Sequence, residues 1–186
     1  MRILALHGYQ TSSKIFYLQS NYLRKILNKD FNIEWLVPNA PFDSNNDSAD
    51  LVKQYFDPPY FYWYTKKEYQ GIDESINYIK SLGKVDGIIG FSQGGCFAQI
   101  LSRIIKPKFV ITICGVDPIN EKYKKISEIP SLHIIGKQDE FRERSELLTN
   151  YFLNPNIIYH TGKHTFPPNK EIYDQIKEFI QIYEKK

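Results

Sequence analysis

Short runs of β-branched and aliphatic residues alternate in this sequence with longer segments of helical periodicity. Parallel strands joined by crossover helices produce such an alternation. The short runs predict six strands, at residues 2–6, 33–37, 87–90, 109–114, 131–136 and 156–160. The periodic segments predict five helices, at residues 16–27, 69–81, 94–105, 142–152 and 170–183. Because right-handed crossovers place helices on both faces of such a sheet, the predicted fold class is α/β: a three-layer sandwich with mainly parallel strands.

The length and composition predict one globular domain over residues 1–186. Hydrophobic residues make up 42% of the chain, enough for a single core, and charged residues make up 24%. The formal charge of +3 comes from interspersed basic and acidic residues, which argues against nucleic-acid binding. No apolar run approaches the roughly 20 residues that a membrane-spanning helix needs.

The amino terminus and the cysteines favour a cytoplasmic protein. Strand-like sequence begins directly after Met1, which leaves no room for a secretory signal peptide. Cys96 and Cys114 cannot form a disulfide framework and are predicted to be buried, reduced thiols. The spacing of the cysteines and histidines indicates no metal site, and we expect no cofactor.

The pentapeptide Gly90-Phe91-Ser92-Gln93-Gly94 lies between a predicted strand and a predicted helix. This context is typical of a nucleophile elbow, a sharp turn that exposes a serine hydroxyl at the edge of the sheet. Gly90 and Gly94 fit where a Cβ atom would collide with the crossing strand and helix. Ser92 is therefore the candidate nucleophile. The alternative is a glycine-rich turn in which the serine only caps the helix.

A serine hydroxyl becomes a good nucleophile only when a base removes its proton, and a carboxylate orients that base. In hydrolases built from alternating strands and helices, these groups follow in the order serine, acid, histidine, on loops after successive strands. Asp139 follows the predicted strand 131–136, and His164 follows the predicted strand 156–160. Ser92, Asp139 and His164 are therefore predicted to form a catalytic triad.

Other residues compete for the acid and base roles. Asp117 follows the predicted strand 109–114 and is an alternative acid, whereas Glu140 is a weaker one. His160 ends a predicted strand and is the alternative base. His133 lies inside an apolar strand and is predicted to be a core histidine with its hydrogen bonds satisfied.

The first predicted strand ends in the turn His7-Gly8-Tyr9-Gln10, which can face the nucleophile. An oxyanion hole belongs at this position, because the negative oxygen that forms during acyl transfer needs backbone N–H donors. The N–H groups of Tyr9 and Gln93 are the predicted donors. His7 is expected to hold the turn in place.

Residues 39–65 form a long connection that is rich in Asp, Asn, Pro and aromatic residues. Residues 43–48 are predicted to be exposed and mobile, whereas the aromatic half carries more apolar area than an idle surface loop. We expect Tyr60, Tyr62 and Trp63 to form the wall of a substrate pocket. The alternative is that these rings pack inward and close the core.

Several segments carry a resemblance to one known family. They are the first strand with its turn, the residues after the second strand, an aromatic pair with the helix start that follows it, the elbow, the acid loop and the histidine loop. Their residues are 3–9, 38–41, 63–64 with 69–75, 86–94, 134–139 and 162–167. Together they resemble the fungal-type family of serine hydrolases within the α/β-hydrolase superfamily, nearly end to end. The resemblance implies an α/β-hydrolase fold.

Residue by residue, the resemblance implies Ser92 as nucleophile, Asp139 as acid and His164 as base. It implies hydrolysis of carboxylic esters through an acyl-enzyme, without a cofactor and with a small-molecule ester or thioester as substrate. Two alternatives stay open. One is an acyl-protein thioesterase-like hydrolase with a larger apolar channel, and the other is a non-catalytic binding module on a hydrolase fold.

Lys163 departs from the family pattern, which usually has glycine immediately before the catalytic histidine. Lysine would be strained there if the loop required a positive φ. The hypothesis is that Lys163 either points to solvent or adds positive charge at the mouth of the pocket, which would favour acidic acyl groups. Comparing Lys163→Ala on neutral and carboxylate-bearing esters tests this, and equal effects on both would exclude the charge role.

Overall fold

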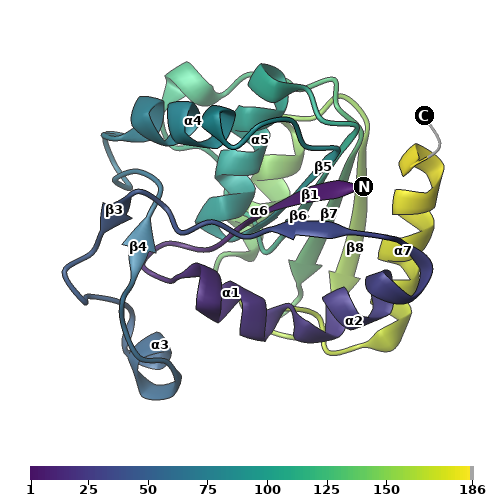
Figure 1. The fold of residues 1–186 in the computed structure, drawn as a ribbon, viewed down its shortest axis with the longest axis horizontal. Helices are drawn as coiled ribbons and strands as arrows, with labels where there is room; N and C mark the ends of the chain where they lie inside the picture. Colours follow the sequence, from purple (N-terminus) through teal and green to yellow (C-terminus); the bar gives the residue numbers. More distant parts are fainter. Residues whose placement is uncertain (185–186) are drawn as a thin grey trace.

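The computed structural model describes residues 1–184, and its centre is a six-stranded sheet with all strands parallel (Figure 1). The spatial order is β2-β1-β5-β6-β7-β8. Along the chain these strands are β1 (Arg2–Leu6), β2 (Glu34–Leu36), β5 (Gly87–Phe91), β6 (Phe109–Ile113), β7 (Ser131–Gly136) and β8 (Pro155–His160). The predicted α/β class and all six predicted strands are confirmed, with bounds that differ by one residue at most.

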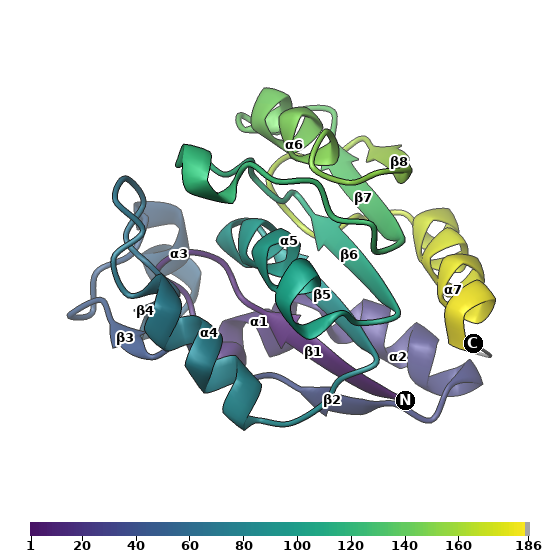
Figure 2. The same cartoon turned by 90° about the horizontal axis from the view of Figure 1, so that it is seen from above.

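Helices cover both faces of the sheet (Figure 2). One face carries α1 (Ser13–Gln19), α2 (Asn21–Asp30) and α7 (Lys170–Glu184). The other carries α4 (Ile72–Ser81), α5 (Gln93–Ile105) and α6 (Arg142–Thr149). A short 3-10 helix, η1 (Glu121–Tyr123), follows β6. Within residues 1–184, no helix has both the length and the apolar character needed to cross a membrane.

The prediction of one helix over residues 16–27 is wrong, because the segment forms α1 and α2 with a break at Ser20. Ser20 is both the C-cap of α1 and the N-cap of α2, with a φ of −86° and a ψ of 4°. Its hydroxyl accepts a hydrogen bond from Arg24 Nε at 3.2 Å. Ser20 N donates to Phe16 O and Ser20 O accepts from Arg24 N, both at 2.9 Å, so the backbone of this one residue ends α1 and begins α2.

The 39–65 connection has secondary structure of its own. It contains the antiparallel pair β3 (Phe42–Asp43) and β4 (Phe61–Tyr62), with α3 (Asp50–Tyr55) between them. Phe61 and Thr11 exchange backbone hydrogen bonds of 3.2 and 2.6 Å, so this hairpin is tied to the turn after β1.

The predicted exposure of residues 43–48 is correct only in part. Ser44 and Ser48 are buried, while the residues between them are exposed. Ser44 Oγ lies 2.9 Å from Tyr60 O, and Ser48 Oγ donates to Gln10 O at 2.5 Å. Small hydroxyl residues here satisfy backbone carbonyls of neighbouring turns, which keeps the base of the loop packed.

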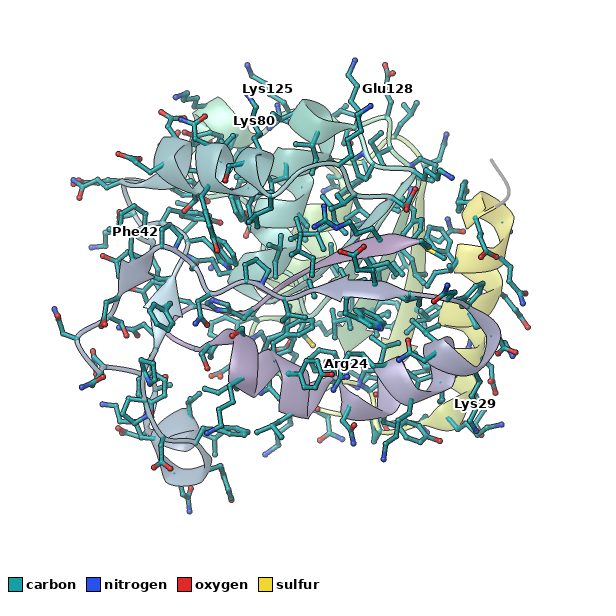
Figure 3. All side chains as sticks on the ribbon, viewed as in Figure 1. Arg24, Lys29, Phe42, Lys80, Lys125 and Glu128 are labelled. Atoms are coloured by element: carbon teal, nitrogen blue, oxygen red, sulfur yellow. The ribbon has the colours of Figure 1, made fainter. Side chains whose placement is uncertain are left out.

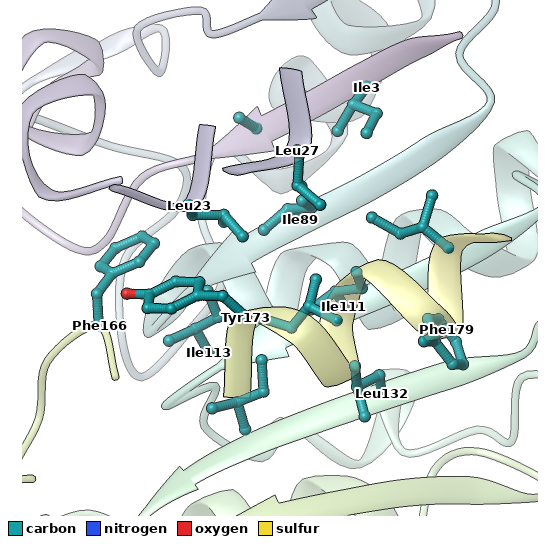
Figure 4. Close-up of a cluster of buried hydrophobic side chains, with 14 of the residues drawn as sticks. Ile3, Leu23, Leu27, Ile89, Ile111, Ile113, Leu132, Phe166, Tyr173 and Phe179 are labelled. Atoms are coloured by element: carbon teal, nitrogen blue, oxygen red, sulfur yellow. The ribbon is translucent and has the colours of Figure 1, made fainter. Parts of the chain in front are cut away.

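Two apolar clusters fill the space between the sheet and its helices. Figure 4 shows the cluster beneath α2 and α7, where Leu23 and Leu27 meet Ile89 of β5. The buried residues of α7 recur at helical spacing and form one face against the sheet: Ile172, Tyr173, Ile176, Phe179 and Ile180. Exposed charges such as Lys29, Lys80 and Glu128 lie at the periphery (Figure 3).

Candidate active site

Ser92 lies at a strained turn between β5 and α5, with a φ of 52° and a ψ of −117°. Residues other than glycine rarely adopt a positive φ, and the backbone strain of such residues concentrates at functional sites. The turn is held by hydrogen bonds from Ser92 N to Ile113 O at 3.1 Å and from Gly95 N to Ser92 O at 2.9 Å. A Cβ atom on Gly90 would collide with the backbone of Gly94, and one on Gly94 with the carbonyl of Leu6. These close approaches give the elbow its shape.

Asp139 and His164 form a hydrogen-bonded pair, with His164 Nδ1 2.8 Å from Asp139 Oδ2. The side chain of Asp139 is fully buried, and its other oxygen accepts from Phe141 N at 2.8 Å. Burial raises the pKa of Asp139, but the hydrogen bonds from His164 and Phe141 outweigh that effect, and the pKa is lowered overall. The group is therefore a carboxylate at neutral pH, which assigns the proton on His164 to Nδ1 and leaves Nε2 without a proton.

The imidazole of His164 lies next to the elbow. Its ring is 5.1 Å from the ring of Phe91, the residue before Ser92, and 5.1 Å from the ring of Phe141. Two aromatic neighbours restrict the ring to one orientation. The structure therefore pairs Asp139, after β7, with His164, after β8, and places the His164 ring against the residue that precedes Ser92.

The competing acids and bases have other environments. Asp117 Oδ1 accepts from Arg144 Nε at 2.7 Å. His133 is buried in β7 between the hydroxyls of Thr112 and Ser131, as predicted for a core histidine. His160 is also buried, and its Nδ1 accepts from Gly162 N at 3.1 Å. Glu140 is exposed.

Both cysteines are free and buried, as predicted, but the position of Cys114 could not be foreseen. Its Sγ, a carboxylate oxygen of Asp139 and a ring nitrogen of His164 all lie within 4.8 Å of one another. A metal would need a thiolate and a free histidine nitrogen. Burial raises the pKa of the Cys114 thiol, and His164 Nδ1 already donates to Asp139. These three residues are therefore better described as a hydrogen-bonded Asp139–His164 pair next to a neutral thiol than as a metal centre.

The predicted oxyanion donors lie on the two turns that flank the nucleophile. Tyr9 is in the turn after β1, and Gln93 is the first residue of α5. Within residues 1–184, the backbone N–H groups of Tyr9 and Gln93 donate to no protein acceptor. Free N–H groups at a helix start and a tight turn suit a developing negative charge.

His7 holds the turn that carries Tyr9. Its Nε2 accepts from Ala40 N at 3.0 Å, so the ring proton is on Nδ1, which lies 2.8 Å from Gly8 O. Trp63 Nε1 donates to His7 O at 3.0 Å. Burial lowers the pKa of His7 to about 4, and the hydrogen bond to Gly8 only partly opposes this shift. A neutral imidazole thus joins the turn to the 39–65 segment.

Acid is expected to destabilise the fold through its buried histidines. Burial lowers the pKa of His133 to about 3, whereas both His7 and His133 titrate near 6.5 in an unfolded chain. Below pH 6.5 the unfolded chain therefore binds more protons, and the free energy of unfolding falls until the folded pKa values are reached. Each histidine should cost about 1.4 kcal/mol between pH 7.5 and 5.5.

Urea unfolding at pH 7.5, 6.5 and 5.5 measures this effect above the range where carboxylates titrate. His133→Gln removes one of the two titrating groups, and this residue lies in β7, away from the turn after β1. The free energy of unfolding should therefore fall less steeply with decreasing pH. A free energy of unfolding that is constant from pH 7.5 to 5.5 would contradict the prediction.

The aromatic candidates of the 39–65 segment separate into two groups. Tyr60 and Trp63 are buried, at 2% and 0% exposure, and Trp63 packs on Phe97 of α5. Tyr62 is half-buried, and its ring lies 5.8 Å from that of Tyr9. Tyr60 and Trp63 therefore pack inward, as in the alternative reading of this segment, while Tyr62 lies beside the turn that carries Tyr9, a predicted oxyanion donor.

The side chain of Gln93 connects the elbow to the same segment. Its Nε2 donates to Tyr64 O at 2.8 Å, and its Oε1 accepts from Trp63 N at 3.1 Å. Sequence reasoning used only the backbone N–H of this residue, because the partners of its side chain lie about 30 residues earlier in the chain. Gln93 therefore couples the helix start to the segment that covers it.

A pocket of about 80 Å³ has both predicted oxyanion donors, Tyr9 and Gln93, in its lining. The other lining residues come from the segments after β4 and β6, from α5 and from α6. Lys163 does not line this pocket, and it is not among the residues with a positive φ. Lys163 therefore lacks the backbone strain that a positive φ would have caused at the position before His164.

The fold is that of the α/β-hydrolase class. Solved esterases share the fold: esterase PE8 matches with a TM-score of 0.68 at 17% identity, over 98% of this chain and 92% of that one. A variant of Arabidopsis thaliana SOBER1 matches with a TM-score of 0.66 at 17% identity, over 98% of both chains.

Sequence similarity shows to which family this chain belongs. The family model described as "Serine hydrolase (FSH1)" matches residues 1–176, so the chain belongs to this serine hydrolase family, as the resemblance predicted. "Family of serine hydrolases 3" of Saccharomyces cerevisiae is 30% identical over 97% of this chain and 83% of its own length. "Esterase OVCA2" of Xenopus tropicalis is 28% identical over 93% of this chain and 90% of its own length.

Proposed function

We propose that this chain is a serine carboxylesterase that cleaves carboxylic esters through Ser92, His164 and Asp139. The observation that carries the proposal is the 2.8 Å hydrogen bond between Asp139 and His164 beside a strained elbow that presents Ser92. A buried carboxylate that fixes the tautomer of a histidine is the arrangement that activates a serine hydroxyl.

In the proposed reaction, His164 Nε2 takes the hydroxyl proton of Ser92 as Oγ attacks the ester carbonyl. The backbone N–H groups of Tyr9 and Gln93 stabilise the negative oxygen of the tetrahedral intermediate, each contributing roughly 3 kcal/mol. Protonated His164 then gives its proton to the departing alcohol, which leaves an acyl group on Ser92. Water, deprotonated by His164 Nε2, then attacks the acyl carbon; the bond to Ser92 Oγ breaks, His164 returns the proton to Oγ, and the carboxylic acid leaves.

The pocket volume favours an ester with a short acyl chain. A cavity of about 150 Å³ is known to hold benzene, and the pocket beside the oxyanion donors has about 80 Å³. A hydrolase for long-chain thioesters would need a larger apolar channel. The proposed substrate is therefore a small ester.

A fluorophosphonate probe tests the proposal, because only a serine with an assembled base reacts with it. Incubation with native and heat-unfolded protein, followed by mass mapping, should place the label on the peptide containing Ser92 in the native sample alone. Hydrolysis of p-nitrophenyl esters from acetate to dodecanoate should be fastest for the short chains. A folded sample that neither labels nor turns over esters would favour a non-catalytic binding module, and a preference for long-chain thioesters would favour the thioesterase.

A further inference from the structure

The pocket beside the oxyanion donors receives the acyl part of the substrate. Its lining includes Tyr9 and Gln93 but not His164. In ester cleavage the histidine must reach the leaving oxygen to protonate it, so the alcohol lies on the side of His164. The other substituent of the carbonyl carbon, the acyl chain, therefore extends into the pocket that the oxyanion donors open. We refer to it below as the acyl pocket.

Three of the ten residues that line the acyl pocket are tyrosines, and Tyr123 packs behind one of them. Tyr64 stacks on Tyr69 with ring centroids 4.4 Å apart, and Tyr69 stacks on Tyr123 at 5.1 Å. The hydroxyl of Tyr69 accepts from Ile119 N at 2.9 Å, which fixes the ring. Rigid walls of this kind limit the pocket to a short chain, since they cannot move aside as flexible aliphatic residues do.

The charged lining of the acyl pocket has more positive than negative groups. Arg144 donates from Nε to Asp117 Oδ1 at 2.7 Å and from Nη2 to Asp117 O at 2.8 Å. Its Nη1 has no partner among residues 1–184. Lys66 also lines the pocket, with its ammonium 4.2 Å from the centroid of the Tyr9 ring. Within the same residues Lys66 forms no ion pair, and Asp117 is the only carboxylate of the lining.

We propose that the acyl pocket binds a short acyl chain that ends in a carboxylate, held by Lys66 and by Nη1 of Arg144. An ammonium positioned over an aromatic ring and a guanidinium oriented by a carboxylate can both donate charge-assisted hydrogen bonds to such a group. The substrate class is thus the monoester of a small dicarboxylic acid. This inference rests on the proposed serine esterase function.

A matched pair of esters tests the inference. Monomethyl succinate and methyl levulinate have acyl groups of nearly the same size and shape, since a methyl group in the second replaces a carboxylate oxygen of the first, and only the first ends in a carboxylate. Methanol release should give a kcat/KM at least about tenfold higher for monomethyl succinate, because a charge-assisted hydrogen bond is worth that much or more. Added salt should reduce this preference.

Substitutions of Lys66 show whether its charge causes the preference. Lys66→Met should lower the succinate-to-levulinate ratio by about tenfold, and Lys66→Glu should bring it below one. Lys67→Met is the matched control, since the neighbouring Lys67 is exposed and does not line the pocket, and its ratio should stay that of the unmodified protein.

The outcomes separate this inference from the proposed function. If methyl levulinate is cleaved and the fluorophosphonate labels Ser92, but the two esters react equally well, the carboxylate inference is wrong while the esterase stands. A ratio that Lys66→Met leaves unchanged also overturns it. If neither ester is cleaved and no label is incorporated, the esterase proposal itself fails.

Discussion

Ser92→Ala is expected to lower kcat for ester hydrolysis by about a million-fold and to abolish labelling by a fluorophosphonate. The loss follows because alanine has no nucleophile for His164 to activate. The fold should persist, since the strain at this residue lies in a backbone with a φ of 52° that any residue with a Cβ atom shares. The free energy of unfolding should change by no more than about 0.5 kcal/mol.

Steady-state hydrolysis of a short p-nitrophenyl ester and urea unfolding of the same preparation measure both effects. Ser81→Ala is the matched control, because Ser81 is an exposed serine at the end of α4. It should retain full activity. More than about one per cent of the original turnover in Ser92→Ala, after purification that excludes contaminating esterases, would contradict the assignment of the nucleophile.

The strands of this fold could be predicted because buried strands consist mainly of apolar residues, which the sequence shows directly. Every residue of β5, β6 and β7 is buried, so each appears as a mainly apolar run between polar segments. The break at Ser20 could not be predicted in the same way. Apolar spacing continues across α1 and α2, and the interruption lies in the backbone of a single residue, Ser20, with a ψ of 4°.

The candidate site also has a part that could be predicted from the sequence and a part that could not. Ser92, Asp139 and His164 could be placed from sequence because each follows a strand, and parallel strands bring their carboxyl ends to one edge. The lining of the acyl pocket could not, since Lys66 and Arg144 come from segments far apart in the chain. Cys114 was assigned burial but no neighbours, because its contact with Asp139 arises only when β6 and β7 pair.

Asp139→Asn is expected to lower kcat by about ten-thousand-fold with little change in KM. The carboxylate holds the proton of His164 on Nδ1 through a 2.8 Å hydrogen bond and stabilises the imidazolium that forms during attack. An amide has the same shape but can donate to Nδ1, which moves the proton to Nε2 and leaves no base facing Ser92. The pKa of Asp139 is lowered, so the unmodified protein has this carboxylate ionised throughout the neutral range.

Two neighbouring acids provide the comparison that identifies Asp139. Glu140→Gln changes an exposed carboxylate one residue away and should keep activity within about twofold. Asp117→Asn should have a far smaller effect on kcat than Asp139→Asn, because Asp117 pairs with Arg144 and not with a histidine. A ten-thousand-fold loss in Asp117→Asn, with nearly full activity in Asp139→Asn, would transfer the acid role to the loop after β6. The order of strand ends that predicted Asp139 would then be wrong by one strand.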